Sequence, residues 1–191
     1  MPGSHVLTIF DALADEPAIR FIPALHENNA VFMANMYAYL TGKPGVVLIT
    51  AGPGATNSIT GVAQAYALSL PVIHITGDIP VRAGNESFHG VDRTDFLHRM
   101  FRDITKWSVR ITEPTQIHSV LAQAFCLASS NRAGPVHIDI PIDITYAQDL
   151  KLDDYQRSSP QRSLPEASLV NAAVERPRQA ANCVICASRG I

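Results

Sequence analysis

Two short stretches hold the residues best suited to chemistry in this sequence. One contains Glu27, a carboxylate expected in the first turn of a helix, where the helix dipole favours negative charge. The other is the turn Gly52-Pro53-Gly54, followed by Asn57 in the first turn of the next predicted helix. Glycines let backbone approach a ligand closely, and the carboxyl end of a strand is the ligand-binding edge of an open α/β sheet. The pattern indicates a small-molecule site; an ordinary first-turn glutamate and a ligand-free turn are the alternatives.

A histidine in a polar loop is a further candidate. His89 lies in SFHGVD at 87–92, within a predicted loop from 77 to 96. Loops longer than ~12–15 residues are often functional, and histidine can relay a proton near neutral pH. A solvated loop histidine is the competing interpretation. We expect His26 to be structural or orienting, and three others to lie at the edge of the core: His74, His118 and His137.

Composition excludes several classes of protein. The 191 residues are 47% hydrophobic, and the 15 Lys and Arg form no cluster of the kind that nucleic acid requires. No apolar run approaches the ~20 residues of a membrane helix, and the N-terminus lacks the basic segment of a signal peptide. Three cysteines make no disulfide framework, and the C-x-x-C pair Cys183 and Cys186 has no second pair nearby. We expect a cytoplasmic protein without metal ligands in these residues.

Alternating strand and helix patterns predict the fold. Stretches that we expect to be strands occur at 19–25, 46–50, 72–76, 106–111 and 136–140, and helical patterns occur at 5–14, 27–41, 55–69, 96–101 and 112–130. This alternation predicts an α/β fold, a doubly wound parallel sheet with helices on both faces. The helix after Glu27 should end at Gly42. It should pack on the sheet through Ala30, Met33, Ala34, Tyr37 and Ala38.

The chain divides into three parts by composition. Residues 1–145 form one predicted domain, residues 146–165 a polar, proline-bearing linker, and residues 166–191 the start of a second α/β domain. In the last part we expect a partial helix over 166–181 and a strand over 183–187. A compact domain rarely begins with a tight turn at its second residue, so we expect the first domain to be N-terminally truncated.

Six motifs occur in order along the first domain. They are HE at 26–27, TGKPGV at 41–46, TAGPGATN at 50–57, ITGDIP at 75–80, ITKW at 104–107 and GPVHIDIPID at 134–143. Over roughly residues 2–150 their spacing resembles the pyrimidine-binding (PYR) domain of thiamine-diphosphate enzymes of the acetolactate synthase, benzoylformate decarboxylase and benzaldehyde lyase type.

The resemblance implies a protein with three domains: PYR, middle, and a pyrophosphate-binding (PP) domain with a GDG…N motif for Mg²⁺. Thiamine diphosphate would lie between the PYR domain of one subunit and the PP domain of another, in a homodimer or homotetramer. The sequence has no GDG motif. We therefore expect a fragment with half an active site, inactive alone, whose Mg²⁺ ligands lie in the missing PP domain.

The resemblance also implies roles for particular residues. Glu27 would hydrogen-bond a ring nitrogen of the aminopyrimidine and promote the tautomer that deprotonates the thiazolium carbon. The turn Gly52-Pro53-Gly54 and Asn57 would lie beside the pyrimidine. His89 matches a position that is often glutamine and points at cofactor and substrate, which makes it a catalytic candidate.

The expected function is that of a lyase or carboligase acting on a 2-oxo acid or aldehyde, either by decarboxylation or by acetolactate synthase-like C–C bond formation. A non-catalytic fragment or dimerisation module that needs a separate PP domain is the main alternative. A generic nucleotide-binding domain is disfavoured because GPGATN at 52–57 lacks the third glycine of G-x-G-x-x-G. The helices after Glu27 and after Gly54 should form the dimer interface.

Overall fold

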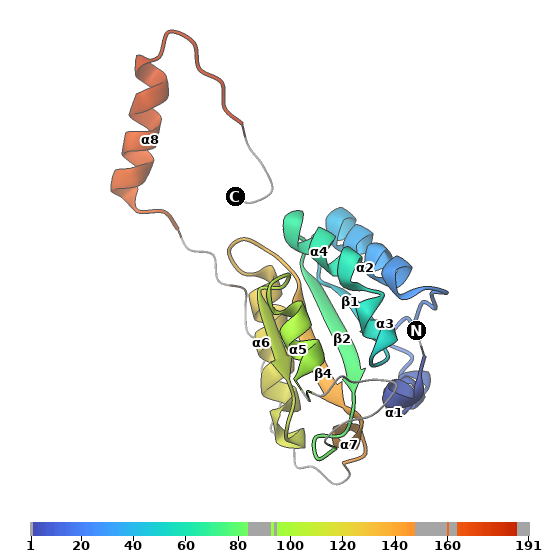
Figure 1. The fold of residues 1–191 in the computed structure, drawn as a ribbon. Coiled ribbons are helices and arrows are strands. Elements are labelled where there is room, and N and C mark those ends of the chain that lie inside the picture. Colours follow the sequence, from blue (N-terminus) through green and yellow to red (C-terminus); the bar gives the residue numbers. More distant parts are fainter. Residues whose placement is uncertain (1, 84–92, 94, 148–159, 161–163, 187–191) are drawn as a thin grey trace.

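A computed structural model describes residues 2–83, 93, 95–147, 160 and 164–186. Within these residues four parallel strands form one sheet in the order β1-β2-β4-β3. The strands are β1 (Gly45–Ile49), β2 (Val72–Asp78), β3 (Trp107–Arg110) and β4 (Val136–Pro141). Helices cover both faces of the sheet (Figure 1), which confirms the predicted doubly wound α/β class.

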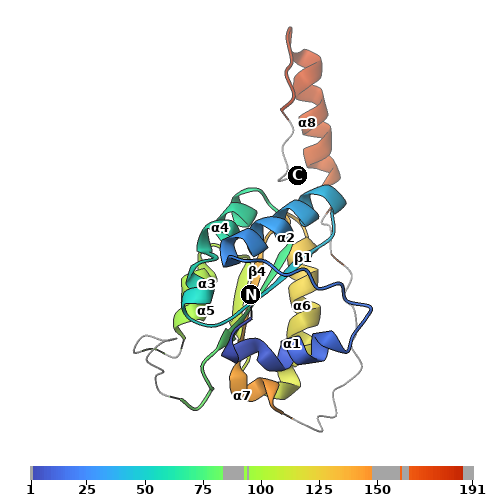
Figure 2. The same cartoon turned by 90° about the vertical axis from the view of Figure 1, so that its right-hand side faces the viewer.

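Two apolar clusters hold the helices against the sheet. On one face the cluster joins the strands to α2 (Glu27–Thr41), α4 (Ile59–Ala67) and α5 (Phe96–Arg102). On the other face it joins them to α1 (Leu7–Ala14), α6 (Ile117–Ser129) and α7 (Ile142–Thr145). Figure 2 shows α2 and α4 crossing one end of the sheet, with α1 and α7 at the other. Alternate residues of β2 serve opposite faces: Val72 enters the first cluster and Ile73 the second.

The face of helix α2 that packs on the sheet is only partly the one predicted: Ala34 and Ala38 are buried as expected, and Ala30 packs against the same cluster. Its buried residues are Glu27, Val31, Ala34, Asn35 and Ala38. Met33 and Tyr37, which we expected inside, are 44% and 49% exposed. Close backbone packing explains the difference: a Cβ on Gly45 would lie 2.3 Å from the carbonyl oxygen of Ala34. Only small side chains fit at that contact, so the large ones turn outward. The predicted end at Gly42 is confirmed, with φ 68°.

Two predicted strands are wrong. Residues 19–25 form no strand, and the side chain of Leu25 is 97% exposed. Pro17 precedes this stretch and Pro23 lies within it, and proline cannot donate a ladder hydrogen bond. The described part of 183–187, residues 183–186, also forms no strand; Val184 and Ile185 are 86% and 81% exposed. Neither apolar run has a neighbouring strand among the described residues, and apolarity alone does not make one.

The helix predicted over 55–69 is two helices. Helix α3 (Pro53–Thr56) ends at Asn57, and α4 begins at Ile59 after the N-cap Ser58. The Ser58 hydroxyl donates to the carbonyl oxygen of Ala55 at 2.6 Å and so occupies an acceptor at the end of α3. This break places Asn57 between two helices and not inside one.

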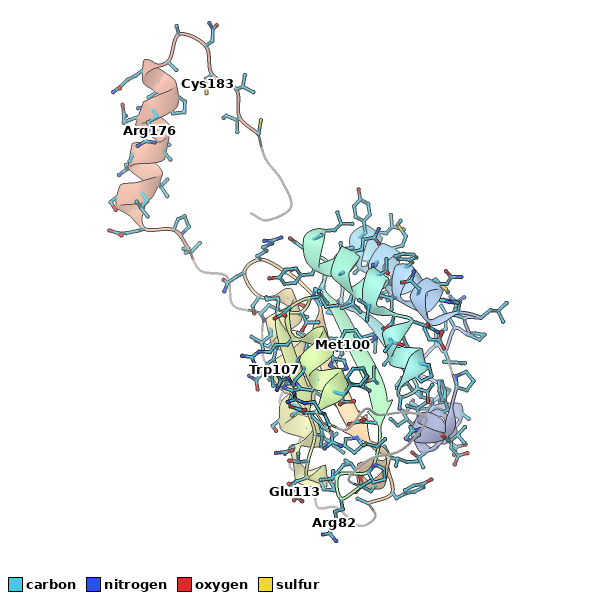
Figure 3. The ribbon with its side chains drawn as sticks, viewed as in Figure 1. Arg82, Met100, Trp107, Glu113, Arg176 and Cys183 are labelled. Atoms are coloured by element: carbon cyan, nitrogen blue, oxygen red, sulfur yellow. The ribbon has the colours of Figure 1, made fainter. Side chains whose placement is uncertain are left out.

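The other predicted elements are present with small shifts. A 3₁₀ turn (Ser4–Val6) precedes α1, and a second one (Pro114–Gln116) precedes α6 with a capping box between Glu113 and Gln116. Helix α8 (Ala167–Gln179) continues through Pro177. In Figure 3 Arg176 and Cys183 lie on the segment that carries α8, away from Trp107 of the sheet.

Candidate active site

Glu27 and Asn57 meet at the carboxyl end of β1. Glu27 begins α2, and its side chain is buried, with the residue 9% exposed. The Asn57 amide donates from Nδ2 to Glu27 Oε2 at 3.2 Å. The chain reaches Asn57 from β1 through the turn at Gly52, whose φ of 57° and ψ of −118° lie in a region that favours glycine. The turn therefore brings an amide donor to a carboxylate that lies 30 residues earlier in the sequence.

The start of α2 is fixed by its own cap. His26 is the N-cap residue, and its Nδ1 accepts the backbone N–H of Asn28 at 3.1 Å. This agrees with the structural or orienting role expected for His26. Because unpaired N–H groups gather in the first turn of a helix, a carboxylate there is electrostatically favoured. The cap therefore fixes Glu27 as the first residue of α2 and holds its backbone in place.

Gly54 and Thr50 form the wall next to the carboxylate. A Cβ on Gly54 would lie 3.7 Å from Glu27 Oε1 and 2.7 Å from Thr50 Cγ2, so the bare backbone of Gly54 faces Oε1. Thr50 Oγ1 is buried without a hydrogen-bond partner among the described residues. A Cβ on Gly3 would come within 2.3 Å of that oxygen. The N-terminal turn thus covers Thr50, a residue that sequence reasoning missed although it directly precedes the Ala51-Gly52 turn.

The structure thus brings together Glu27, Gly54 and Asn57, with Gly52 and Pro53 forming the turn between them. Pro53 is exposed at the first position of α3. His89 lies outside the described residues, and its catalytic role stays a prediction. Among the described residues no group of three or more His, Cys, Asp and Glu could hold a metal ion. No described helix is long and apolar enough to cross a membrane.

Two histidines lie in the centre of the sheet and not at the core edge. His74 and His137 are both 0% exposed, and Phe101 packs on both rings. Burial lowers the pKa of His74 to about 3, and burial together with the neighbouring His74 lowers the pKa of His137 well below its usual range. The prediction was wrong for both because β2 and β4 pair with each other at the centre of the sheet. His118 is half-buried on α6.

A buried ionic group lies beside these histidines. Arg110 Nε contacts Asp78 Oδ2 at 2.6 Å and Asp139 Oδ2 at 3.9 Å. Asp139 accepts the Thr76 hydroxyl at Oδ1. Burial raises the pKa of Asp139 well above its usual range, and the charge and hydrogen bonding of Asp78 raise it further. Two carboxyl groups with one arginine are best satisfied by a shared proton, and the raised pKa favours the neutral form of Asp139.

Comparison with known proteins shows the family of this chain. Residues 1–101 match the family described as "Thiamine pyrophosphate enzyme, N-terminal TPP binding domain". The chain belongs to this family of thiamine-diphosphate enzymes, as an N-terminal PYR domain of the acetolactate synthase-like type. This confirms the resemblance drawn from the six motifs.

Curated relatives give the same picture. The chain is 42% identical over 144 residues to "Acetolactate synthase isozyme 3 large subunit" of Escherichia coli (strain K12), which covers 75% of the chain and 24% of that protein. It is 39% identical over 147 residues to "Acetolactate synthase catalytic subunit, mitochondrial" of Saccharomyces cerevisiae, covering 76% of the chain and 21% of that protein. The match to "Acetolactate synthase large subunit" of Lactococcus lactis is 37% over 154 residues, covering 80% and 26%. The chain thus spans about a quarter of the length of these relatives.

Proposed function

We propose that this chain provides the pyrimidine-binding half of the active site of an acetolactate synthase-like carboligase, with Glu27 as the group that activates the cofactor. The observation that carries the proposal is the buried Glu27 carboxylate, held by Asn57 and facing the bare backbone of Gly54. The similarity to acetolactate synthases over about 150 residues supports this choice of reaction over decarboxylation alone.

The donor set fits an aminopyrimidine. Such a ring needs a carboxylate for a ring nitrogen, close backbone for its flat face, and hydrogen-bonding groups at its edge. Glu27 provides the carboxylate and Gly54 provides the open backbone, against which the Thr50 methyl group packs. The Thr50 hydroxyl, which has no hydrogen-bond partner among the described residues, is buried under Gly3. Bound thiamine diphosphate would supply a nucleophilic thiazolium carbon that adds to a carbonyl substrate.

Each residue then has a definite task. Glu27 exchanges a proton with a pyrimidine ring nitrogen at Oε1, the oxygen that faces Gly54. Gly52 sets the direction of the turn, and Gly54 leaves the space that a side chain would fill. Burial of the carboxylate keeps water away and strengthens its interaction with a bound ring. His89, which follows β2 in the sequence, is proposed as a proton donor toward the substrate.

The remaining parts of the proposed enzyme lie outside these residues. A PP domain holds the diphosphate through Mg²⁺, and residues 166–191 begin the middle domain after a linker at 146–165. A second copy of the chain packs on α2 in a homodimer or homotetramer. The support for that surface is an apolar stripe on α2, exposed at 44–73%: Met33, Met36, Tyr37 and Leu40. The substrates are 2-oxo acids or an aldehyde, and the compartment is the cytoplasm.

Glu27→Gln tests the proposal in the whole protein loaded with thiamine diphosphate and Mg²⁺. The amide keeps the shape of the side chain but cannot exchange a proton, so we expect deuterium exchange at the thiazolium carbon to slow by at least about 100-fold. The measurement is proton NMR after a quenched pulse in D₂O. Glu16→Gln, on an exposed turn, is the matched control. Unchanged exchange in Glu27→Gln would overturn the role of Glu27.

The alternative function is a non-catalytic dimerisation module. The exposed stripe on α2 would serve such a module equally well. Titration calorimetry of the whole protein with thiamine diphosphate and Mg²⁺ separates the two. Saturable binding favours the enzyme, whereas dimerisation without binding favours the module. Product analysis with pyruvate then distinguishes carboligation from decarboxylation.

A further inference from the structure

We infer that Asn57 is a positioning residue for Glu27 and not a direct contact to the cofactor. The inference rests on the proposed function, because it concerns the same carboxylate. We predicted from the sequence that Asn57 would be part of the cofactor-binding turn. The geometry points instead to an amide that fixes one oxygen of Glu27 and reserves the other for the ligand.

The hydrogen bond divides the carboxylate into two unequal oxygens. Oε2 accepts from Asn57 Nδ2 at 3.2 Å, whereas Oε1 accepts no hydrogen bond from the described residues. Oε1 is also the oxygen that lies near Gly54, where a Cβ would stand 3.7 Å away. The terminal torsion of a glutamate is broad and nearly two-fold. The Asn57 amide removes that freedom and leaves Oε1 directed at the open backbone.

A second pair of contacts fixes the position of Asn57 relative to Glu27. Gly61 is the third residue of α4, and N–H groups in the first turn lack partners within their own helix. The Gly61 N–H donates instead to Asn28 Oδ1 at 2.8 Å, and the Gly61 carbonyl accepts from Asn35 Nδ2 at 3.0 Å. Two asparagines of α2 therefore hold the first turn of α4.

Gly61 is the residue that permits this approach. A Cβ there would lie 2.7 Å from Val31 Cβ and 2.9 Å from Asn28 Oδ1, closer than real atoms pack. A single residue, the N-cap Ser58, separates Asn57 from the start of α4. The clamp between α2 and α4 therefore holds Asn57 beside Glu27.

Asn57 is itself exposed, so a direct contact with the ligand is the competing possibility. A double-mutant cycle separates the two. If Asn57 acts through Glu27, its removal matters only while the Glu27 carboxylate is present, and the two effects are not additive. If Asn57 contacts the ligand directly, its removal costs the same with or without that carboxylate.

The experiment uses the whole protein and calorimetric affinity for thiamine diphosphate with Mg²⁺. We expect Asn57→Ala to weaken binding about tenfold in the wild-type background, the loss typical of one hydrogen bond to a charged group. In the Glu27→Ala background the same change should cost less than about twofold. Thr56→Ala is the matched control: its hydroxyl donates within the same turn, to the carbonyl of Pro53, and does not touch Glu27. It should leave the affinity unchanged.

Asn57→Asp gives an independent readout in a side chain of the same shape. Near neutral pH it places a carboxylate against Glu27 Oε2, and we expect affinity at least about tenfold below wild type. When the pair takes up one proton at lower pH, the new carboxyl can donate to Oε2 as the amide did. Affinity relative to wild type at the same pH should then recover by pH ~5.5, whereas Asn57→Ala should not recover.

The outcomes also separate this inference from the proposed function. A tenfold loss from Asn57→Ala in the Glu27→Ala background would overturn the positioning role, as would an Asn57→Asp variant whose affinity ratio does not change with pH. If Glu27→Ala and Glu27→Gln leave both binding and proton exchange at wild-type values, the proposed function itself fails, whatever Asn57 does. Unfolding midpoints of all variants at each pH establish that they remain folded.

Discussion

The imidazole ring of His74 lies 5.3 Å from that of His137, and Phe101 packs on both. Each imidazole has a hydroxyl partner: Ser58 Oγ lies 2.8 Å from His74 Nε2, and Ser108 Oγ lies 2.8 Å from His137 Nδ1. Thr76 Oγ1 joins His137 Nε2 at 2.9 Å. The central pair of strands is thus held together by neutral polar groups that a single added proton would disturb.

The first prediction concerns acid stability. The native pKa of His74 is about 3, against an ordinary 6.5 in the unfolded chain, and that of His137 is also lowered. Below pH 6.5 these histidines bind protons in the unfolded chain but not in the native state. The free energy of unfolding therefore falls as the pH falls toward the native pKa values. Each imidazole contributes about 1.4 kcal/mol per pH unit in that window. Urea unfolding between pH 7.5 and 5 should show this slope.

Two variants check the assignment of the slope. His74→Phe removes one titrating group, so its acid slope should be markedly shallower than that of wild type. Phe101→Leu alters packing against the same rings without removing a titrating group, and should lower stability about equally at both pH values. Equal slopes in His74→Phe and wild type would show that other groups carry the acid response.

The second prediction concerns the opposite end of the pH range. The pKa of Asp139 is raised in the native state, so the stability gained from its bound proton is present at low pH and is lost as pH rises toward the native value. Asp139→Asn carries that donor permanently and can still accept from Thr76. We expect the variant to lie within about 1 kcal/mol of wild type at pH 5 and to be more stable than wild type at pH 9.

Denaturant unfolding at both pH values measures this crossover. Asp103→Asn, on an exposed residue after α5, removes the same charge without burial. The unfolding free energy of this variant should change with pH in the same way as that of wild type. If Asp139→Asn also runs parallel to wild type, the buried proton is not on Asp139.

The third prediction concerns the site wall. In Gly54→Ala the new methyl group would lie 2.7 Å from Thr50 Cγ2 and 3.3 Å from Ile49 Cγ2. Overpacking of this kind costs about 1–3 kcal/mol in unfolding free energy, and we expect thiamine diphosphate affinity to fall by more than about tenfold. Gly42→Asn is the control: it lies in open space at φ 68°, a conformation that asparagine tolerates, and should change neither quantity much. Wild-type affinity in Gly54→Ala would place the cofactor elsewhere.

The fourth prediction concerns the proposed subunit surface. Leu40 is 73% exposed on α2. Leu40→Lys introduces a charge into the apolar stripe, which should raise the dimer dissociation constant of the whole protein at least about tenfold. Analytical ultracentrifugation over a concentration series measures it. Gln123→Lys adds the same charge on α6, on the opposite face of the sheet, and should not affect assembly. A Leu40→Lys dimer as tight as wild type would show that α2 is not at the interface.

Sequence patterns predicted the parallel sheet because a buried parallel strand is typically a continuous apolar run, as at 46–50. They failed at 19–25 for the same reason, since a run of apolar residues indicates burial only when a neighbouring strand exists. They also placed Met33 and Tyr37 on the packed face of α2, where the structure leaves them exposed. Helical periodicity does not distinguish large apolar residues from small ones. The close approach of Ala34 and Gly45 leaves room for small side chains only on the packed face.

The candidate site was predictable in its residue types but not in its connections. Glu27, Gly54 and Asn57 stood out through their motifs. The direction of the Asn57 amide toward Glu27 could not be predicted, because it depends on the break between α3 and α4 at Asn57-Ser58. Thr50 was missed because a lone threonine at a strand end carries no distinctive signal. Only the approach of Gly3 and Gly54 shows that it is enclosed.

The strand order has a consequence for the timing of folding. β4 lies between β2 and β3, yet it leaves the ribosome after both of them. At synthesis rates of about 5–20 residues per second, β2 therefore waits several seconds for its central neighbour. During that interval β2 can pair with β1 on one side, while its other edge stays open. Until residue 141 has emerged, that open edge is therefore a part of the nascent sheet able to pair with another strand.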